Sequence, residues 1–279
     1  MRYERLSVSE RRTVPPAIAV SAVGFAIAPP PDALVGEPQE IPAGSNTRKI
    51  AAATTLWIPL VRRTREPFAG AWALPGGPTE WHETLADTAL RTLTAAALRK
   101  PGYLEQLYAF GAVERSAQAQ RLVTIAYWAL YGERDLTDPE GSSATSTSSG
   151  VNPVTPDPNV AWFSADRLPT LAFDHAEIVE YALWRLRVKT EYAAVTHRFL
   201  GDKFTLAQLR RVYEAILGQS VDPANFRRQS LASGNLIETG EFQTGSAHRP
   251  ARLYRFRNDT PMPAGGDSPV LSTTQGKPQ

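Results

Sequence analysis

The pattern of apolar and polar residues predicts two strands and a helix in the first hundred residues. Residues 17–27 (AIAVSAVGFAI) are mostly small or β-branched and are typical of a buried strand. Residues 54–63 (TTLWIPLVRR) predict a second strand, and Pro59 within it favours an edge or a bulge. Residues 83–99 predict a helix, because no helix breaker follows until Pro101.

The middle of the chain continues the strand pattern across a low-complexity segment. Strands are predicted at 103–113 (YLEQLYAFGAV) and 122–132 (LVTIAYWALYG), on either side of a polar turn at 114–120. Residues 139–159 are rich in Ser, Thr, Pro and Gly, and VAWFSADRLPTL at 160–171 predicts one more strand and a turn. A domain boundary at 139–159 would leave the first domain one strand short. We therefore expect 139–159 to be a disordered insertion within that domain.

A long helix is predicted next, from an N-cap at Asp174 to about Lys189. Ile178 and Leu186 lie on its apolar side, and a short helix is expected at about 190–200.

The last ordered unit has clear start and stop signals. Thr205 and Gln208 form a capping box before an apolar stripe, and Gly218 is placed as a C-cap. Asp222 is an N-cap that is followed by Pro223 at the first helical position. Two alternating strands around a polar loop come after this second helix. Helix, turn, helix and a two-stranded wing is the order of a winged helix.

Length and composition agree with a two-domain globular protein. A chain of 279 residues with 42% hydrophobic and 21% charged residues can form two cores. We expect a first domain at 1–189, a winged helix at 190–258 and a disordered tail at 259–279. The fold class is α+β.

Charge and cysteine content narrow the partners and the compartment. Residues 198–257 hold ten Arg and Lys against five Asp and Glu, so this segment carries +5 while the rest of the chain carries −3. Such asymmetry favours an anionic partner for the C-terminal part, although charged faces are often only solvated. There is no cysteine, no apolar run long enough for a membrane span and no secretory signal pattern at the N-terminus. We expect a cytoplasmic protein without a membrane partner.

The segment LPGGPTEWHETLADTALRTLTAAAL, from Leu74 to Leu98, resembles the Nudix box. The pattern of that box is Gly, five residues, Glu, seven residues, then Arg-Glu-apolar-x-Glu-Glu-x-Gly. Gly77, Glu83 and Arg91 match it at the required spacing. The resemblance implies a Nudix fold, with a mixed sheet between helices.

The glutamates that bind metal in the Nudix family are missing here. Their positions hold Thr92, Ala95 and Ala96. Positions i, i+3 and i+4 share a helix face, where three carboxylates hold Mg²⁺ against a diphosphate and activate water. Threonine and alanine supply no such charge, so we predict no catalytic residues, no bound metal and no cofactor.

Glu80, Glu83 and Asp87 remain as acids near the start of the helix. Glu83 and Asp87 are four residues apart and can hold an ion weakly, or they are solvated acids favoured by the helix dipole. Arg91 orients a catalytic glutamate in the Nudix family, and here it can pair with Glu83 instead.

A Nudix groove can still bind a nucleoside diphosphate derivative. Arg62 and Arg63 are candidates to meet phosphates, and Trp57, Trp72 or Tyr127 to stack on a base. The alternatives are solvation for the arginines and core packing for the aromatic residues. The predicted ligand-binding residues are Arg62, Arg63, Trp72, Gly77, Glu80, Glu83 and Arg91.

Both parts together resemble the NrtR family, the Nudix-related transcriptional regulators of NAD metabolism. The motifs beyond the box are YLEQLYAFG (103–111), LPTLAFDHAEIVEYALWRLR (168–187), FTLAQLRRVYEAILG (204–218), NFRR (225–228) and HRPARLYRF (248–256). The chain departs from the family in the segments 28–49 and 139–159 and in the tail after 258, which puts loop contacts in doubt.

The resemblance implies a homodimer on a palindromic operator near genes of NAD synthesis or salvage. Its effector would be ADP-ribose or a related NAD-derived nucleotide, which releases the DNA. Two other functions are weighed against this one. They are a surviving pyrophosphatase that uses Glu80, Glu83 and Asp87, and a winged helix that serves only protein interaction.

The second helix of the winged helix, from Pro223 to about Ser233, is expected to enter the major groove. Arginine reads guanine, and asparagine or glutamine reads adenine. Phe226 and Leu231 are expected on its buried side. The predicted DNA-binding residues, which include phosphate contacts and the wing, are Lys203, Thr205, Arg210, Asn225, Arg227, Arg228, Gln229, His248 and Arg249.

Overall fold

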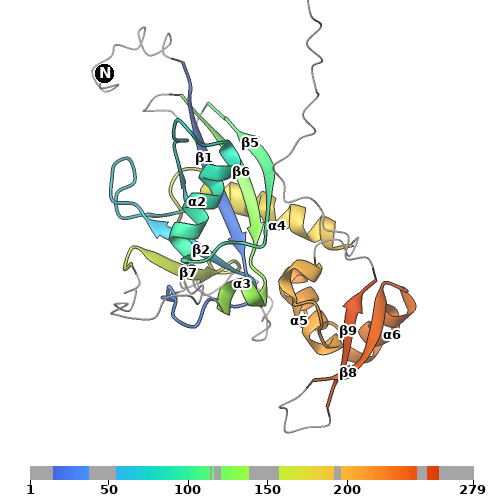
Figure 1. Cartoon of the computed structure of the whole chain (residues 1–279). Helices are drawn as coiled ribbons and strands as arrows, with labels where there is room; N and C mark the ends of the chain where they lie inside the picture. Colours follow the sequence, from blue (N-terminus) through green and yellow to red (C-terminus); the bar gives the residue numbers. More distant parts are fainter. Residues whose placement is uncertain are drawn as a thin grey trace, which may run out of the picture.

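The computed structural model in Figure 1 describes residues 15–37, 55–113, 115, 121–137, 157–191, 196–243 and 250–257, without the side chains of 189–191. The predicted turn at 114–120 and insertion at 139–159 lie almost wholly outside these residues, as do much of the 28–49 segment and the tail.

Residues 15–191, which we call the first half, contain two sheets. Their strands are β1 Ala17–Phe25, β2 Trp57–Arg62, β3 Trp72–Ala73, β4 Gly76–Gly77, β5 Tyr103–Phe110, β6 Leu122–Leu130 and β7 Val160–Ser164. Within the described residues, one sheet has the order β4-β1-β6-β5 and the other β3-β2-β7. β1 runs parallel to β6, and the other pairings are antiparallel. A bridge between Ala26 and Trp57 joins the two sheets.

β1 is central, which explains its continuous apolar sequence. Every residue from Val20 to Ala26 is buried, because β4 and β6 flank the strand and helices α2 (Leu85–Ala97) and α4 (His175–Glu191) both contact it. Figure 1 shows these two helices on either side of the sheet. The predicted mixed sheet between helices is therefore confirmed.

The strand predicted after residues 139–159 is confirmed as β7. Its pairing shows that the prediction of an edge or a bulge at Pro59 is wrong. β7 pairs antiparallel with β2, and β3 pairs with the other side of β2, so β2 is a central strand and not an edge. Successive residues of a strand bond to opposite sides. Trp57 and Arg63 donate away from β7, to Ala26 and Ala71. The Pro59 nitrogen faces the same side, between these two bonds, where no strand pairs with it among the described residues.

The predicted helices of the first half form close to their expected limits. Thr84 caps α2 in a box with Asp87, and Leu98 ends it in the left-handed region. Asp174 precedes α4 and its carbonyl accepts from Ile178, while its carboxylate forms an ion pair with Arg115. The expected short helix is observed as η3, Thr196–Phe199.

His175 joins the start of α4 to the segment that leads into α2. Its side chain is buried, and its Nδ1 accepts a hydrogen bond of 2.9 Å from the backbone N–H of Leu74. Burial, and after it the charges of Arg115 and Arg63, lower the pKa of His175 to about 3. The imidazole is therefore neutral in the folded protein at neutral pH.

The C-terminal unit is a helix pair with a two-stranded wing. Its elements are α5 Leu206–Leu217, α6 Pro223–Ala232, β8 Leu236–Phe242 and β9 Arg252–Phe256. The capping box at Thr205 and the C-cap at Gly218, with φ of 66°, are confirmed, as is the N-cap at Asp222. A small core of Phe204, Leu209, Phe226 and Tyr254 holds these elements together.

One core prediction for α6 is wrong. Phe226 is buried as expected, but the side chain of Leu231 is 43% exposed. Leu231 lies five residues after Phe226, and five residues correspond to about 140° around an α-helix. Ser230, four residues after Phe226, is partly buried on the inner side instead.

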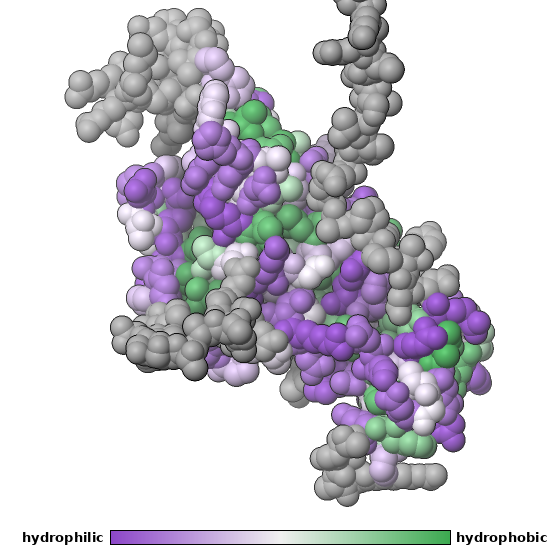
Figure 2. Space-filling model, viewed as in Figure 1, coloured by the Kyte–Doolittle hydropathy of each residue, from purple (hydrophilic) through white to green (hydrophobic). Residues whose placement is uncertain are grey.

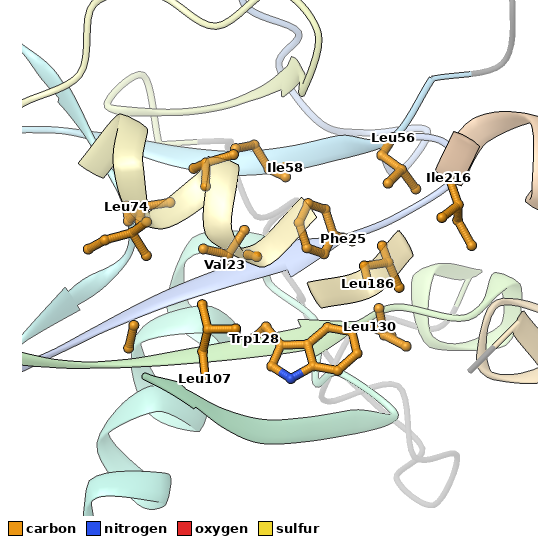
Figure 3. Packing of buried hydrophobic residues seen from close by; sticks show 14 of the residues in the cluster. Val23, Phe25, Leu56, Ile58, Leu74, Leu107, Trp128, Leu130, Leu186 and Ile216 are labelled. Carbon is orange, nitrogen blue, oxygen red and sulfur yellow. The ribbon is translucent and has the colours of Figure 1, made fainter. Parts of the chain in front are cut away.

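The C-terminal unit packs onto the first half through α5. Val212, Ala215 and Ile216 belong to the same buried cluster as Leu186 of α4 and Leu130 of β6. Figure 3 shows Leu186, Leu130 and Ile216 pointing toward one another. A cavity of about 260 Å³ lies beside this contact, toward the N-terminal part of the same face of α5, and residues of both halves line it. No helix of the described residues is long and apolar enough to cross a membrane.

We predict that His175 makes the stability of the protein pH-dependent in mildly acidic solution. The pKa of His175 is about 3 in the folded protein, and the ordinary value is near 6.5. At a pH between these two values, only the unfolded chain binds a proton at this residue. The free energy of unfolding therefore falls as the pH drops below 6.5, and the share due to His175 is about 2 kcal/mol at pH 5. Denaturant unfolding at pH 7 and pH 5 should show that His175→Asn removes this share.

The exposed His82 provides the control. His82→Asn should lose as much stability as the wild type between pH 7 and pH 5. An equal loss in His175→Asn and wild type would contradict the prediction.

Candidate functional sites

The segment that resembles the Nudix box begins as a short strand held against β1. Gly76 and Gly77 pair with Ser21 and Val20. A Cβ on Gly76 would lie 2.2 Å from the carbonyl oxygen of Val20, so only glycine permits this close approach. We call residues 74–84 the box loop. They begin two residues before this strand and end at Thr84, the N-cap of α2.

The three positions of the missing glutamates lie on α2. The Thr92 hydroxyl donates to the Thr88 carbonyl at 2.9 Å, Ala95 is exposed and Ala96 is buried. None of them presents a carboxylate. Among the described residues, no cluster of three or more His, Cys, Asp or Glu has the arrangement of a metal site.

The remaining acids are engaged in local contacts. The Arg91 guanidinium forms two hydrogen bonds to the Glu83 carboxylate, one of them at 2.9 Å, and lies 3.8 Å from Glu80. The Arg91 hydrogen bond is the main cause that lowers the pKa of Glu83 to about 2. The predicted pairing of Arg91 with Glu83 is thus confirmed. Asp87 accepts from the backbone N–H and the hydroxyl of Thr84, which also lowers its pKa.

Arg62, Arg63 and Trp72 form a second group on β2 and β3. Arg62 pairs with Trp72 across the strands, and its guanidinium lies 5.9 Å from the centre of the Trp72 ring. Arg62 also donates to the carbonyl of Gly70 at 3.1 Å. Arg63 donates to the carbonyl of Pro67 at 2.8 Å and lies 4.7 Å from the Phe173 ring. Both arginines therefore shape the loop between β2 and β3.

The other two aromatic candidates differ in exposure. Trp57 is half-buried and pairs with Ala26 and Ser164. Tyr127 is only 6% exposed and packs with Val20 and Leu93, so it belongs to the core and is not available to stack on a base.

The candidate DNA-reading helix α6 presents a polar outer face. Arg227, Arg228 and Gln229 are exposed, and Arg228 donates to the side chain of Asn225 at 2.8 Å. On the face seen in Figure 2, hydrophilic residues of this unit lie beside apolar patches. These four side chains therefore lie on or near the surface, one helical turn or less apart.

One predicted DNA contact is corrected by the structure. Thr205 is 3% exposed, because its hydroxyl caps α5 and accepts from the backbone of Gln208. Arg210 donates to Glu214 at 3.1 Å and to the carbonyl of Val221 at 3.2 Å, and its side chain is 29% exposed. Arg210 therefore braces the winged helix, and its contact with a phosphate stays a prediction.

The remaining predicted contacts lie at the wing. Lys203 is exposed and forms an ion pair with Glu241 of β8, with Nζ–Oε distances of 2.6 and 2.9 Å. His248 and Arg249 lie outside the described residues.

A buried polar group beside the box loop was not predicted from the sequence. Arg115 has a side chain that is 1% exposed, pairs with Asp174 and donates to Thr124 at 3.0 Å. His175 lies next to this group. The only signal in the sequence was the pair Asp174-His175 at the start of a helix. Local periodicity does not distinguish such a pair from an ordinary helix cap.

Comparison with known proteins gives matches over both halves. A family model of the NrtR DNA-binding winged helix domain matches residues 197–256. A curated relative from Acinetobacter baylyi, the ADPR responsive transcriptional repressor NtrR, is 32% identical over 205 residues, which are 72% of this chain and 76% of that protein.

Solved structures match the whole architecture. Shewanella oneidensis NrtR superposes with a TM-score of 0.57 at 31% identity, over 86% of this chain and 94% of the other. The same protein in complex with a 27mer DNA gives a TM-score of 0.58 at 27% identity, over 86% and 93%. These matches confirm the predicted Nudix fold with a C-terminal winged helix. The chain belongs to the NrtR family of Nudix-related transcriptional regulators.

Proposed function

We propose that this protein is a transcriptional repressor that releases its DNA operator when ADP-ribose or a related NAD-derived nucleotide binds. The proposal rests mainly on the Acinetobacter baylyi relative, named as an ADPR responsive transcriptional repressor, which matches 72% of this chain and 76% of its own length. The regulated genes are those of NAD synthesis or salvage. The protein acts on the operator as a homodimer, because one winged helix covers only a half-site.

We propose that residues 1–189 form the sensor domain, 190–258 the winged helix and 259–279 a tail. The sensor is supported by the retained shape of the box without its carboxylates. Gly76 forms a close approach to β1, and Arg91 pairs with Glu83 across the start of α2. Thr92, Ala95 and Ala96 remove the charge that a catalytic metal needs.

The effector groove is proposed to lie between two groups of residues. One is Arg62, Arg63 and Trp72 at the ends of β2 and β3, and the other is Glu80, Glu83 and Arg91 at the start of α2, with Gly77 between them. The guanidinium groups suit phosphates and the Trp72 ring suits a base. The loop that Arg63 holds in place forms one wall.

The winged helix is proposed to read DNA through α6. Arg227, Arg228, Asn225 and Gln229 have the donors and acceptors that major-groove readout requires. Lys203, His248 and Arg249 are proposed to contact the backbone from the wing side.

We predict that the purified protein does not hydrolyse ADP-ribose efficiently. Losing the metal site removes several kcal/mol of transition-state stabilisation. Chromatographic assays of AMP formation with Mg²⁺ or Mn²⁺ should give less than about 1 s⁻¹, below the range of typical enzymes. Faster turnover that is abolished by Glu83→Gln would instead assign the protein to the pyrophosphatases.

We predict that the protein binds ADP-ribose in calorimetry and that Arg63→Ala weakens this binding about 10-fold or more. The loss of one charge-assisted contact is worth about 1.5–3 kcal/mol. The matched control is Arg167→Ala, which removes an exposed arginine in the turn after β7 and should bind as the wild type does. If Arg63→Ala binds ADP-ribose with wild-type affinity, Arg63 only supports the loop and does not contact the ligand.

We predict that Arg227→Ala or Arg228→Ala weakens operator binding by about 1–3 kcal/mol if the arginine reads a base. The variant should then also discriminate less between the operator and other sequences. An arginine that contacts a phosphate should weaken all DNA alike and reduce the salt slope by about one unit. Anisotropy titrations at two salt concentrations separate the two roles, with Arg167→Ala as the control. If both variants retain wild-type affinity and slope, α6 is not the reader.

A further inference from the structure

Helix α4 is attached at its first residue to the segment that carries the box loop. His175 accepts a hydrogen bond from the backbone N–H of Leu74 at 2.9 Å. Ala172, three residues before His175, donates its backbone N–H to the carbonyl of Trp72 at 2.8 Å. Leu171 forms an isolated β-bridge with Trp72. The start of α4 is thus tied to β3 and to the box loop by adjacent hydrogen bonds.

The same end of α4 also contacts the loop between β2 and β3. Phe173 lies 4.8 Å from the Phe68 ring and beneath the Arg63 guanidinium. The start of this helix therefore contacts both the loop that Arg63 holds in place and the first residue of the box loop.

The other end of α4 is attached to the winged helix. The Nε of Arg187 donates to the carbonyl of Ile216 at 3.0 Å, in the last turn of α5. Carbonyls in the last turn lack partners within the helix, and a cation there also interacts favourably with the helix dipole. Beside this bond, Leu186 and Ile216 are both fully buried in the common core (Figure 3).

The contact of α5 with the first half is closely packed at α4 and β6, and it leaves a cavity beside this packing. The cavity has a volume of about 260 Å³ and lies toward the N-terminal part of the same face of α5. Gln208, Arg211 and Val212 line it from α5, and Leu136 and Pro29 line it from the first half. α5 therefore borders a region that protein atoms do not fill.

We infer that α4 transmits effector binding to the winged helix through its two terminal hydrogen bonds, His175 to Leu74 and Arg187 to Ile216. The inference rests on the proposed function. From His175 to Arg187 the helix is continuous and spans about 18 Å at 1.5 Å per residue, so a displacement at its start reaches α5 undiminished. The effector shifts α5 between two positions relative to the cavity, and α6 moves with α5. His175 and Arg187 are positioning residues, since neither is required to touch the effector or DNA.

The test is the coupling between the two ligands in the full-length protein. The operator dissociation constant is measured by anisotropy without and with saturating ADP-ribose, and the ratio of the two values is the coupling factor. His175→Phe keeps an aromatic ring but loses the acceptor, and Arg187→Met keeps the aliphatic stem but loses the donor. Each should reduce the coupling factor at least 10-fold, while the affinity for operator alone and for ADP-ribose alone stays within about threefold.

Matched controls separate transmission from loss of structure. His175→Asn retains an acceptor near the position of Nδ1, and Arg185→Met removes a neighbouring arginine of α4 that faces Glu105 instead of α5. Both should keep the wild-type coupling factor. The double variant His175→Phe/Arg187→Met should lose no more coupling than either single variant, because both bonds belong to one connection.

The outcomes that overturn the inference are distinct from those that overturn the proposed function. If ADP-ribose weakens operator binding equally in wild type and Arg187→Met, α4 does not transmit the signal although the repressor function stands. If wild type binds no operator or does not respond to ADP-ribose, the proposed function and the inference both fail. Should His175→Phe not fold, as judged by circular dichroism, Arg187→Met decides alone.

Discussion

The burial of one face of α5 in the core of the first half is the contact on which the rest of the structure depends. Val212, Ala215 and Ile216 join a cluster that also contains Leu186 of α4 and Leu130 of β6. Apolar surface removed from water stabilises by about 25 cal/mol per Å², so this shared core holds α5 against the first half. α6 and the wing are then positioned through α5, so the same contact places the winged helix relative to the two sheets.

The segment that resembles the Nudix box keeps an ordered start of α2 without the three carboxylates of the family pattern. In an active box, three carboxylates on one helix face repel one another unless a metal is bound. Thr92, Ala95 and Ala96 remove that repulsion, and the Thr92 hydroxyl bonds within α2. The Glu83–Arg91 pair and the capping box at Thr84 keep the helix start in place. The geometry of the loop is thus maintained by contacts that need no metal.

Local signals in the sequence determined most of the secondary structure. Caps act within three or four residues, so Thr205, Gly218 and Asp222 were sufficient to place both ends of α5 and the start of α6. The spacing of Gly77, Glu83 and Arg91 likewise indicated the box, and with it the fold and the Glu83–Arg91 pair. These features depend on neighbours along the chain, which the sequence displays directly.

Tertiary structure decided the features that depend on distant neighbours. Pro59 lies in a central strand because its nitrogen faces a gap between Ala26 and β3, and Tyr127 is lost as a stacking candidate because the core covers it. Arg210 turns inward to Glu214 and Val221, and His175 reaches the backbone of a residue 101 positions away. The sequence by itself determined the order of the elements and the positions of most of their caps. Only the tertiary structure decided which polar groups stay at the surface and which join the two halves, because a buried polar group needs a partner that lies far away along the chain.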